Sequence, residues 1–263
     1  MKVIAIMQAR LGATRLPNKV LLPLRGGTAL SYELERVKKS KLIDEVVVAT
    51  TTSPNDQKLI EYLDSIGQPY FAGSEQDVLD RYYRTAEHYC EDDTDVIVRL
   101  TADCPLTDPK IIDQVVSTYL DNGHDFVSNS LEPYSFPDGM DVEVFSYKNL
   151  KKAWKEATLP SHREHVTFYF WQNPEIFKIF YVQNPQNLTG YRMTLDYPED
   201  YELIKKVCQH FEEQNNSDFG MEEIIAFLDQ RPDIKNLNAI RIQNSGWSSA
   251  LEKDKKFLED KKE

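Results

Sequence analysis

The stretch VIAIMQARLGATRLPNKVLLPL, from Val3 to Leu24, decides the fold. Residues 3–7 form a short apolar run, which is typical of a strand buried on both faces of a parallel sheet. The residues after it carry the cations Arg10, Arg15 and Lys19 among glycine, proline and asparagine, which indicates a sharply turning loop. Ligands bind beyond the carboxyl ends of strands in such sheets, and exposed N–H groups with fixed cations suit a polyphosphate. The stretch therefore predicts a phosphate-binding loop.

This loop matches neither of the common glycine-rich phosphate motifs. The spacings G-x-x-x-x-G-K-[ST] and G-x-G-x-x-G are both absent from it. A basic loop can also be an ordinary solvated turn, and that interpretation stays open on composition alone.

Strand and helix patterns alternate through the first half of the chain. Buried strands are expected at Glu45–Ala49 and Asp95–Leu100, each a nearly continuous apolar run. Helical periodicity is expected over Thr28–Lys39, Asn55–Ile66, Asp77–Tyr89 and Pro109–Tyr119. This order predicts an α/β fold, a three-layer α/β/α sandwich around a mostly parallel, Rossmann-like sheet.

The second half is less regular, and no long linker divides it. Short strands are expected at Phe126–Ser128, Val142–Phe145 and Tyr191–Leu195, with helices at Lys148–Ala157, at Ser161–Trp171 and from Pro198 onward. We predict one domain over residues 1–232, followed by an extension over 233–263. From Leu251 the extension is almost entirely Lys, Glu and Asp, which indicates a solvated helix or a disordered, mobile tail.

Composition narrows the class of partner. The 263 residues include 43 acidic and 31 basic side chains, and the net charge of −12 argues against a general nucleic-acid binder. The three cysteines are widely spaced, and we interpret them as free thiols in a reducing cytoplasm. No apolar stretch approaches the about 18–20 residues that span a bilayer, and the first residues do not form a secretory signal. We expect a cytoplasmic protein that binds neither nucleic acid nor membrane.

Two aspartates are expected at the same edge of the sheet as the basic loop. Asp103 comes just after the strand expected at 95–100, and Asp196 just after the strand expected at 191–195. Mg²⁺ usually takes one or two carboxylates and completes its octahedron with phosphate oxygens and water. The pair therefore predicts a magnesium site beside a polyphosphate. The alternative is that each aspartate only caps the helix that follows it.

Two weaker features suggest a pocket for a second substrate. Asp138, Asp141 and Glu143 lie around a turn and could bind sugar hydroxyls, although a plain Asp-Gly turn is at least as good an interpretation. Arg163 and His165, near the start of a helix, could position a carboxylate, or could simply face water. Cys104 has no basic partner nearby in the sequence, so we interpret it as a small buried residue.

Four motifs in this order carry a family resemblance: QARLGATRLPNKVL, GSEQDVLDRYY, LTADCPLTDP and TLDYPEDYELI. They resemble the bacterial cytidylyltransferases that activate acidic sugars, the CMP-Kdo and CMP-neuraminic acid synthetases, and most closely the branch of spore coat polysaccharide biosynthesis protein F. The likeness runs from about Met1 to Phe211. It implies the nucleotide-diphospho-sugar transferase fold, CTP as donor, magnesium and a homodimer.

The resemblance also implies roles for individual residues. Arg10 and Lys19 fall on the positions that hold the triphosphate, and Asp103 and Asp196 on the metal-binding aspartates. Thr101-Ala102-Asp103 stands where the Kdo enzymes carry Gln-Gly-Asp, so the choice between cytosine and uracil stays open. The expected nucleotide site comprises Ala9, Arg10, Leu11, Gly12, Arg15, Lys19, Arg81 and Thr101. The expected acceptor site comprises Asp138, Asp141, Arg163, Glu164 and His165.

These observations predict a Mg²⁺-dependent cytidylyltransferase that transfers CMP from CTP to an acidic sugar or similar anionic acceptor and releases pyrophosphate. A glycosyltransferase of the same fold and a catalytically idle nucleotide-binding protein are the alternatives. Cations placed for the β- and γ-phosphates favour nucleotidyl transfer, because pyrophosphate is then the leaving group.

Overall fold

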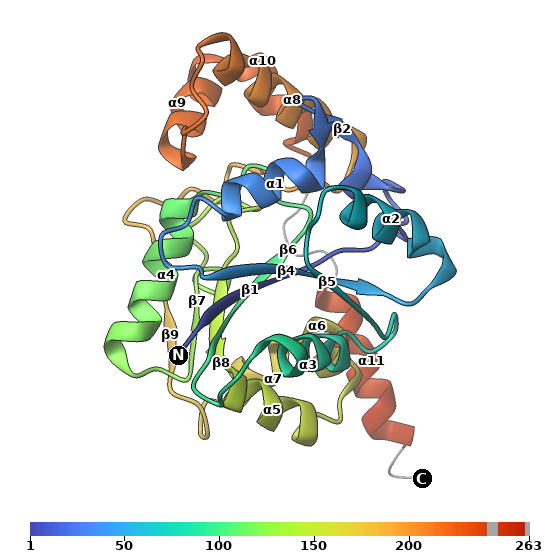
Figure 1. The fold of residues 1–263 in the computed structure, drawn as a ribbon. Helices are drawn as coiled ribbons and strands as arrows, with labels where there is room; N and C mark the ends of the chain where they lie inside the picture. Colours follow the sequence, from blue (N-terminus) through green and yellow to red (C-terminus); the bar gives the residue numbers. More distant parts are fainter. Residues whose placement is uncertain (241–246, 261–263) are drawn as a thin grey trace.

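A single sheet forms the centre of the chain in the computed structural model, which describes residues 1–240 and 247–260 (Figure 1). The sheet has seven strands in the order β5-β4-β1-β6-β8-β7-β9. Only β8 runs antiparallel to its neighbours. The strands are β1 (Val3–Gln8), β4 (Glu45–Thr51), β5 (Tyr70–Gly73), β6 (Val96–Thr101), β7 (Phe126–Ser128), β8 (Glu143–Ser146) and β9 (Ile179–Tyr181), and a separate hairpin pairs β2 (Pro23–Leu24) with β3 (Gly27–Thr28).

Helices cover both faces of the sheet, as the alternating strand and helix pattern predicts (Figure 1). The α-helices are α1 (Ala29–Val37), α2 (Gln57–Ser65), α3 (Val78–Tyr89), α4 (Pro109–Asn122), α5 (Tyr147–Glu156), α6 (Pro160–His165), α7 (Phe168–Trp171), α8 (Pro198–Glu213), α9 (Met221–Gln230), α10 (Pro232–Lys235) and α11 (Trp247–Asp260). Three 3-10 helices, η1 (Lys19–Leu21), η2 (Pro54–Asp56) and η3 (Asn236–Asn238), complete the set. The predicted three-layer α/β/α sandwich is confirmed.

The alternation of side chains along β1 creates two apolar cores. Val3, Ala5 and Met7 pack into the core beneath α1, α2, α4, α8 and α9. Ile4 and Ile6 point the other way, into the core beneath α3, α5 and α7. Because every side chain of this strand except that of Gln8 is buried, β1 holds the middle of the sheet rigidly and fixes the start of the loop that follows it.

The strand order reverses beside β1. The chain passes from β1 to β4 and β5 on one side, and then returns to β6 on the other. Loops that leave β1 and β6 at their carboxyl ends therefore diverge and leave a crevice between them, which is the usual ligand site of open α/β sheets. The predicted basic loop and Asp103 both lie at this point.

The strand predicted at Tyr191–Leu195 is wrong. Only Arg192 forms a bridge there, to Asp138, through Asp138 N–H to Tyr191 O over 3.1 Å and Met193 N–H to Asp138 O over 2.7 Å. Leu195 N–H donates to Asp103 O over 2.7 Å. These partners lie in turns, so no regular ladder forms, and Met193 and Leu195 are anchored by burial instead.

The single helix predicted over Ser161–Trp171 is also wrong. It is broken into α6 and α7 at Val166, which has a positive φ of 57° and a fully buried side chain. The strands β5 and β9 were not predicted, because neither shows a long apolar run. The other predicted elements are confirmed to within a few residues at their ends.

The extension beyond residue 232 packs against the domain over part of its length. Asn238 of η3 is 2% exposed and donates to Asp200, and Asp254 of α11 is 6% exposed. Residues 251–260 are therefore helical and mostly exposed, which agrees with the solvated helix that we expected, except that Asp254 is packed against the domain. The boundary at residue 232 stays a prediction. In the described ranges, no helix combines the length and apolarity that crossing a membrane requires.

Candidate active site

The loop after β1 is held in place at its start by hydrogen bonds from two of its backbone N–H groups. Ala9 N–H donates to Ala49 O over 3.1 Å, and Leu11 N–H donates to Asp56 Oδ1 over 2.6 Å. The loop ends at Asn18, whose left-handed φ of 58° turns the chain into η1. This turn buries Lys19 at the start of η1 and directs its side chain back toward the carboxyl edge of the sheet.

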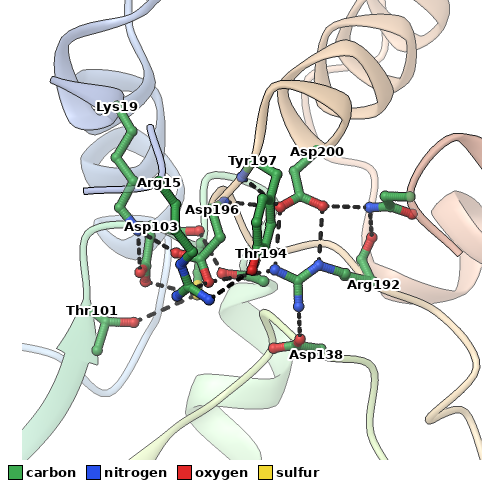
Figure 2. Close-up of polar contacts among 12 residues, drawn as sticks. Arg15, Lys19, Thr101, Asp103, Asp138, Arg192, Thr194, Asp196, Tyr197 and Asp200 are labelled. Carbon is green, nitrogen blue, oxygen red and sulfur yellow. Dashed lines mark hydrogen bonds and ion pairs between the residues drawn. The ribbon is translucent and has the colours of Figure 1, made fainter. Parts of the chain in front are cut away.

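Lys19 bridges the two aspartates that the sequence singled out (Figure 2). Its Nζ lies 2.7 Å from Asp103 Oδ2 and 2.7 Å from Asp196 Oδ1, and Arg15 Nη2 lies 2.9 Å from Asp196 Oδ2. Burial alone would lower the pKa of Lys19, but the two carboxylates raise it well above its usual value. Burial would raise the pKa of Asp103, and Lys19 instead lowers it to about 2. Lys19 and Asp103 are therefore both charged at neutral pH.

Asp196 is positioned by the first turn of α8. The carboxylate of Asp200, which is fully buried, accepts hydrogen bonds from the N–H groups of Asp196 and Tyr197, each over 2.9 Å. Arg192 Nε donates to the other oxygen of Asp200 over 3.0 Å, and Arg192 also pairs with Asp138 (Figure 2). A helix cap thus serves as the support of Asp196, in place of the predicted strand.

Gly139 allows the Asp138 turn to approach this segment closely. Its φ is +99°, and a Cβ atom at this position would lie 2.5 Å from Thr194 N. Both the conformation and the lack of space require glycine. The Asp-Gly turn is therefore real, and it also places Asp138 at the site.

Two cavities meet at the aspartates. The larger has a volume of about 790 Å³ and lies between the loop after β1, the start of α3 and the end of α6. The smaller has a volume of about 270 Å³ and lies toward β8 and the Asp138 turn. The residues that line both are Arg15, Arg99, Thr101, Asp103, His165 and Asp196. The aspartate pair therefore stands where ligands in the two cavities would touch.

The larger cavity holds two further cations suited to anionic groups. Arg10 is exposed, and its guanidinium has neither a hydrogen-bond nor an ion-pair partner within the described ranges. Arg81 is 3% exposed, donates to Ser74 O over 2.6 Å, and has an Nε atom with no partner in the same part of the chain. Burial lowers the pKa of Arg81. The free donors of these two guanidinium groups suit a polyphosphate or a similarly polar ligand.

Acidic side chains dominate the smaller cavity. Arg99 pairs with Glu143 across neighbouring strands, and Asp138 pairs with Arg192. The Asp141 carboxylate has no hydrogen-bond or ion-pair partner among the residues that the structure describes. Burial, with the repulsion of nearby acids, raises the pKa of Asp138 to about 6 and that of Asp141 well above its usual value. This cavity suits a ligand that offers several hydrogen-bonding groups.

The aspartate pair fits a divalent cation. Asp103 and Asp196 each direct one oxygen at the same ammonium group, so both can face one cation. Within the described residues no cluster of three or more metal-ligating side chains forms, and Asp103 and Asp196 are the pair that would face the cation. Two carboxylates are the donor set typical of Mg²⁺ beside phosphate. Phosphate oxygens and water then fill the remaining coordination positions of the ion.

Most predicted site residues line the cavities, but two do not. Ala9, Arg10, Gly12, Lys19, Arg81 and Glu164 line the larger cavity, Asp138 and Asp141 line the smaller, and Arg15, Thr101, Asp103, His165 and Asp196 line both. Leu11 is buried in the core, and Asp56 occupies its N–H group. Arg163 turns away to Asp77, with Nε 3.0 Å from its Oδ2, because α6 packs against α3. This placement gives Leu11 and Arg163 structural contacts in place of ligand contacts.

Two site residues were missed, Arg99 and Arg192, while Glu143, one of the three acids expected around the turn, lines the smaller cavity. Arg192 precedes Asp196 by four residues, and its alternation with buried Met193 and Leu195 was a usable signal that it faces the same side as Asp196. Arg99 and Glu143 each interrupt an apolar strand, and pair only because β6 and β8 are neighbours. That pairing could not be read from local sequence.

The family model of the cytidylyltransferases matches residues 4–236. An uncharacterized protein of Methanocaldococcus jannaschii is 44% identical over 241 residues, covering 91% of this chain and 95% of that protein. Spore coat polysaccharide biosynthesis protein SpsF of Bacillus subtilis is 33% identical over 240 residues, covering 88% and 95%. A solved cytidylyltransferase from Leptospira borgpetersenii has a TM-score of 0.82 and 38% identity, covering 90% of this chain and 98% of that one.

The fold and the site define a nucleotidyltransferase. The chain belongs to the cytidylyltransferase family, as the resemblance of its four motifs implies. The predicted enzyme class is confirmed.

Proposed function

We propose that this protein transfers CMP from CTP to an acidic, hydroxyl-bearing sugar or similar acceptor, with Mg²⁺, and releases pyrophosphate. The observation that carries the proposal is the position of Asp103, Asp196 and Lys19 at the junction of the two cavities. A donor nucleotide in the larger cavity and an acceptor in the smaller would bring their reacting atoms together at this junction.

The larger cavity suits CTP because its lining combines cations with an exposed loop backbone. Arg10, Arg15 and Lys19 come from the loop and η1, and Arg81 from α3. In this assignment Arg10 and Lys19 bind the phosphates that leave as pyrophosphate, and they neutralise the charge that grows on the leaving group. Arg81 offers its free Nε to the nucleotide.

The residues at the junction would act by orientation and charge. The acceptor oxygen is itself the nucleophile, so no covalent enzyme intermediate is needed, and holding it in line with the α-phosphorus is the main task. Asp103 and Asp196 would hold Mg²⁺, with Lys19 moving from their carboxylates to the phosphates when CTP binds. When bound, Mg²⁺ stabilises negative charge on the phosphates and orients them.

The smaller cavity restricts the acceptor. Its acids, Asp138 and Asp141 among them, favour a molecule rich in hydroxyl groups, because hydroxyl groups can donate hydrogen bonds to the carboxyl oxygens. An anionic group of the acceptor has a place beside Arg99, whose Nε has no partner in the described part of the chain. His165 lines the same cavity and, since burial lowers its pKa to about 4, is a neutral hydrogen-bonding group there.

Glycosyl transfer from a nucleotide-sugar is the second candidate, because the same fold and aspartates could serve it. The two loop cations disfavour it, since a β,γ-diphosphate is then absent from the substrate. Initial rates of pyrophosphate release with each nucleoside triphosphate, against a panel of acidic sugars, test the proposal. Consumption of nucleotide-sugars without pyrophosphate release would support the alternative.

The relatives suggest a setting and an assembly. SpsF is named for spore coat polysaccharide biosynthesis, so we propose a role in making a surface polysaccharide or glycan in the cytoplasm. The three free cysteines agree with a reducing compartment. The family resemblance implies a homodimer, which analytical ultracentrifugation would test.

A further inference from the structure

The C-terminal helix α11 reaches the wall of the larger cavity. Lys253 of this helix lines that cavity together with the basic loop, Arg81 and Glu164. The family model ends at residue 236, so this cation comes from a part of the chain that the model does not cover. Its presence there is unexpected for a charged C-terminal segment.

Three polar contacts attach α11 to α6. Asp254 Oδ1 accepts a hydrogen bond from Ser161 N over 2.8 Å, and Asp254 Oδ2 accepts one from Ser161 Oγ over 2.5 Å. Lys253 Nζ lies 2.8 Å from Glu164 Oε2. The side chains of Asp254 and Ser161 are buried, and Ala250 one turn earlier is 1% exposed. This side of α11 is therefore packed against α6.

The contact with Ser161 also completes α6. The residue before this helix, Leu159, has no side chain that can cap it, so its first N–H groups need other partners. Asp254 supplies one of them from 93 residues away. Since α6 carries Glu164 and His165 into the site, the docking of α11 bears on the position of both.

The ion pair of Lys253 can be exchanged at little cost. Its side chain is 54% exposed and that of Glu164 is 44% exposed, and exposed pairs of this kind contribute little to stability. A triphosphate entering the cavity brings several negative charges within reach of the same ammonium group. Lys253 is thus placed to leave Glu164 for a phosphate.

We propose that α11 is a wall of the nucleotide cavity, that Lys253 binds the nucleoside triphosphate, and that Asp254 is the residue that positions it. The inference rests on the proposed function in one respect, that the larger cavity takes CTP. It assigns a role to residues beyond the end of the family match at residue 236.

Calorimetric titration of the full chain with CTP tests the inference. Lys253→Ala should weaken CTP binding by about three- to tenfold, Lys253→Glu should weaken it more, and Lys253→Arg should bind almost as the wild type does. Lys255→Glu, an equal charge change on an exposed residue of the same helix, is the matched control and should change binding less than about twofold.

Asp254→Ala separates positioning from general stability. It should weaken CTP binding as Lys253→Ala does, and the double variant should be no weaker than either single one, because both changes remove the same contact. Faster amide exchange in 247–260 of Asp254→Ala, with unchanged exchange in β1, would show that the loss is local.

Two results would overturn the inference. One is equal CTP affinity for Lys253→Glu, Lys255→Glu and the wild type; the other is a wild type that does not bind CTP. A wild type that binds CTP but releases no pyrophosphate with any acceptor would refute the proposed reaction alone, and the comparison of Lys253→Glu with Lys255→Glu would still decide the role of α11.

Discussion

The ammonium of Lys19 lies 2.7 Å from a carboxylate oxygen of Asp103, although 84 residues separate the two in the chain. Lys19 makes a second contact of the same length with Asp196. The cation stands between two acids that are expected to bind a metal, so it already compensates their charge before a nucleotide arrives. Substrate binding would then replace one cation by another.

Removing either aspartate's charge should stop the reaction. In Asp103→Asn and Asp196→Asn a hard anionic ligand is lost while the shape is kept, so we expect each to reduce kcat by at least about 10²- to 10³-fold. Steady-state rates at saturating Mg²⁺ measure this, and EDTA should inactivate the wild type similarly. A near-native rate in either variant would show that the replaced aspartate is structural and is not needed to bind the metal.

Lys19→Ala should distinguish the phosphates that Lys19 binds. A charge-assisted contact contributes roughly 1.5–3 kcal/mol, so CTP affinity should fall about ten- to a hundredfold, while CMP, which lacks the β- and γ-phosphates, binds almost as before. Calorimetry with CTP, CDP and CMP measures the difference. Equal weakening for all three would move Lys19 to the α-phosphate and remove the argument for pyrophosphate as leaving group.

The sequence predicted those parts of the site that depend on neighbouring residues, and it missed those that depend on partners far along the chain. The parallel core was predictable because β1, β4 and β6 are apolar runs, and the cluster at Lys19 was predictable because parallel strands share one edge. Asp196 was placed correctly at that edge for the wrong reason. Asp196 is held by Asp200, which accepts a hydrogen bond from its N–H group at the start of α8, and the strand predicted at 191–195 does not form.

Other features depended on partners far along the chain. Leu11 was expected in the nucleotide site, but its side chain is buried and its N–H group donates to Asp56 of η2. Arg163 was expected to bind the acceptor, but Asp77, which caps the start of α3, pairs with it. The docking of α11 also depends on a distant partner, because a segment rich in charge gives no local sign that Asp254 will be buried.

Gly139→Ala should damage the site more than the fold around β1. The added Cβ would approach Thr194 N to 2.5 Å at a φ that disfavours alanine, so the Asp138 turn must move away from the segment 192–194. We expect a loss of stability of about 1–3 kcal/mol and a raised KM for the acceptor, with a smaller change in KM for CTP. Chemical denaturation and steady-state kinetics measure both. An unchanged acceptor KM would contradict the assignment of the smaller cavity.

His165 predicts a particular pH dependence of stability. Burial lowers its pKa to about 4, against about 6.5 for an unfolded histidine, so the unfolded chain binds more protons between these values. The free energy of unfolding should therefore fall as the pH drops from about 6.5 to 4, by up to about 1.4 kcal/mol per pH unit from this group. The difference between wild type and His165→Gln isolates it, because other groups cancel. A difference that is constant over this range would show that His165 titrates normally.

The most direct test of nucleotidyl transfer is the ³¹P NMR spectrum of the products. Wild-type protein with CTP, Mg²⁺ and the acceptor selected from the panel should yield pyrophosphate and a CMP conjugate in equal amounts, and Asp103→Asn should yield neither. Consumption of a nucleotide-sugar with release of a nucleoside diphosphate, and no pyrophosphate from CTP with any acceptor of the panel, would contradict the account.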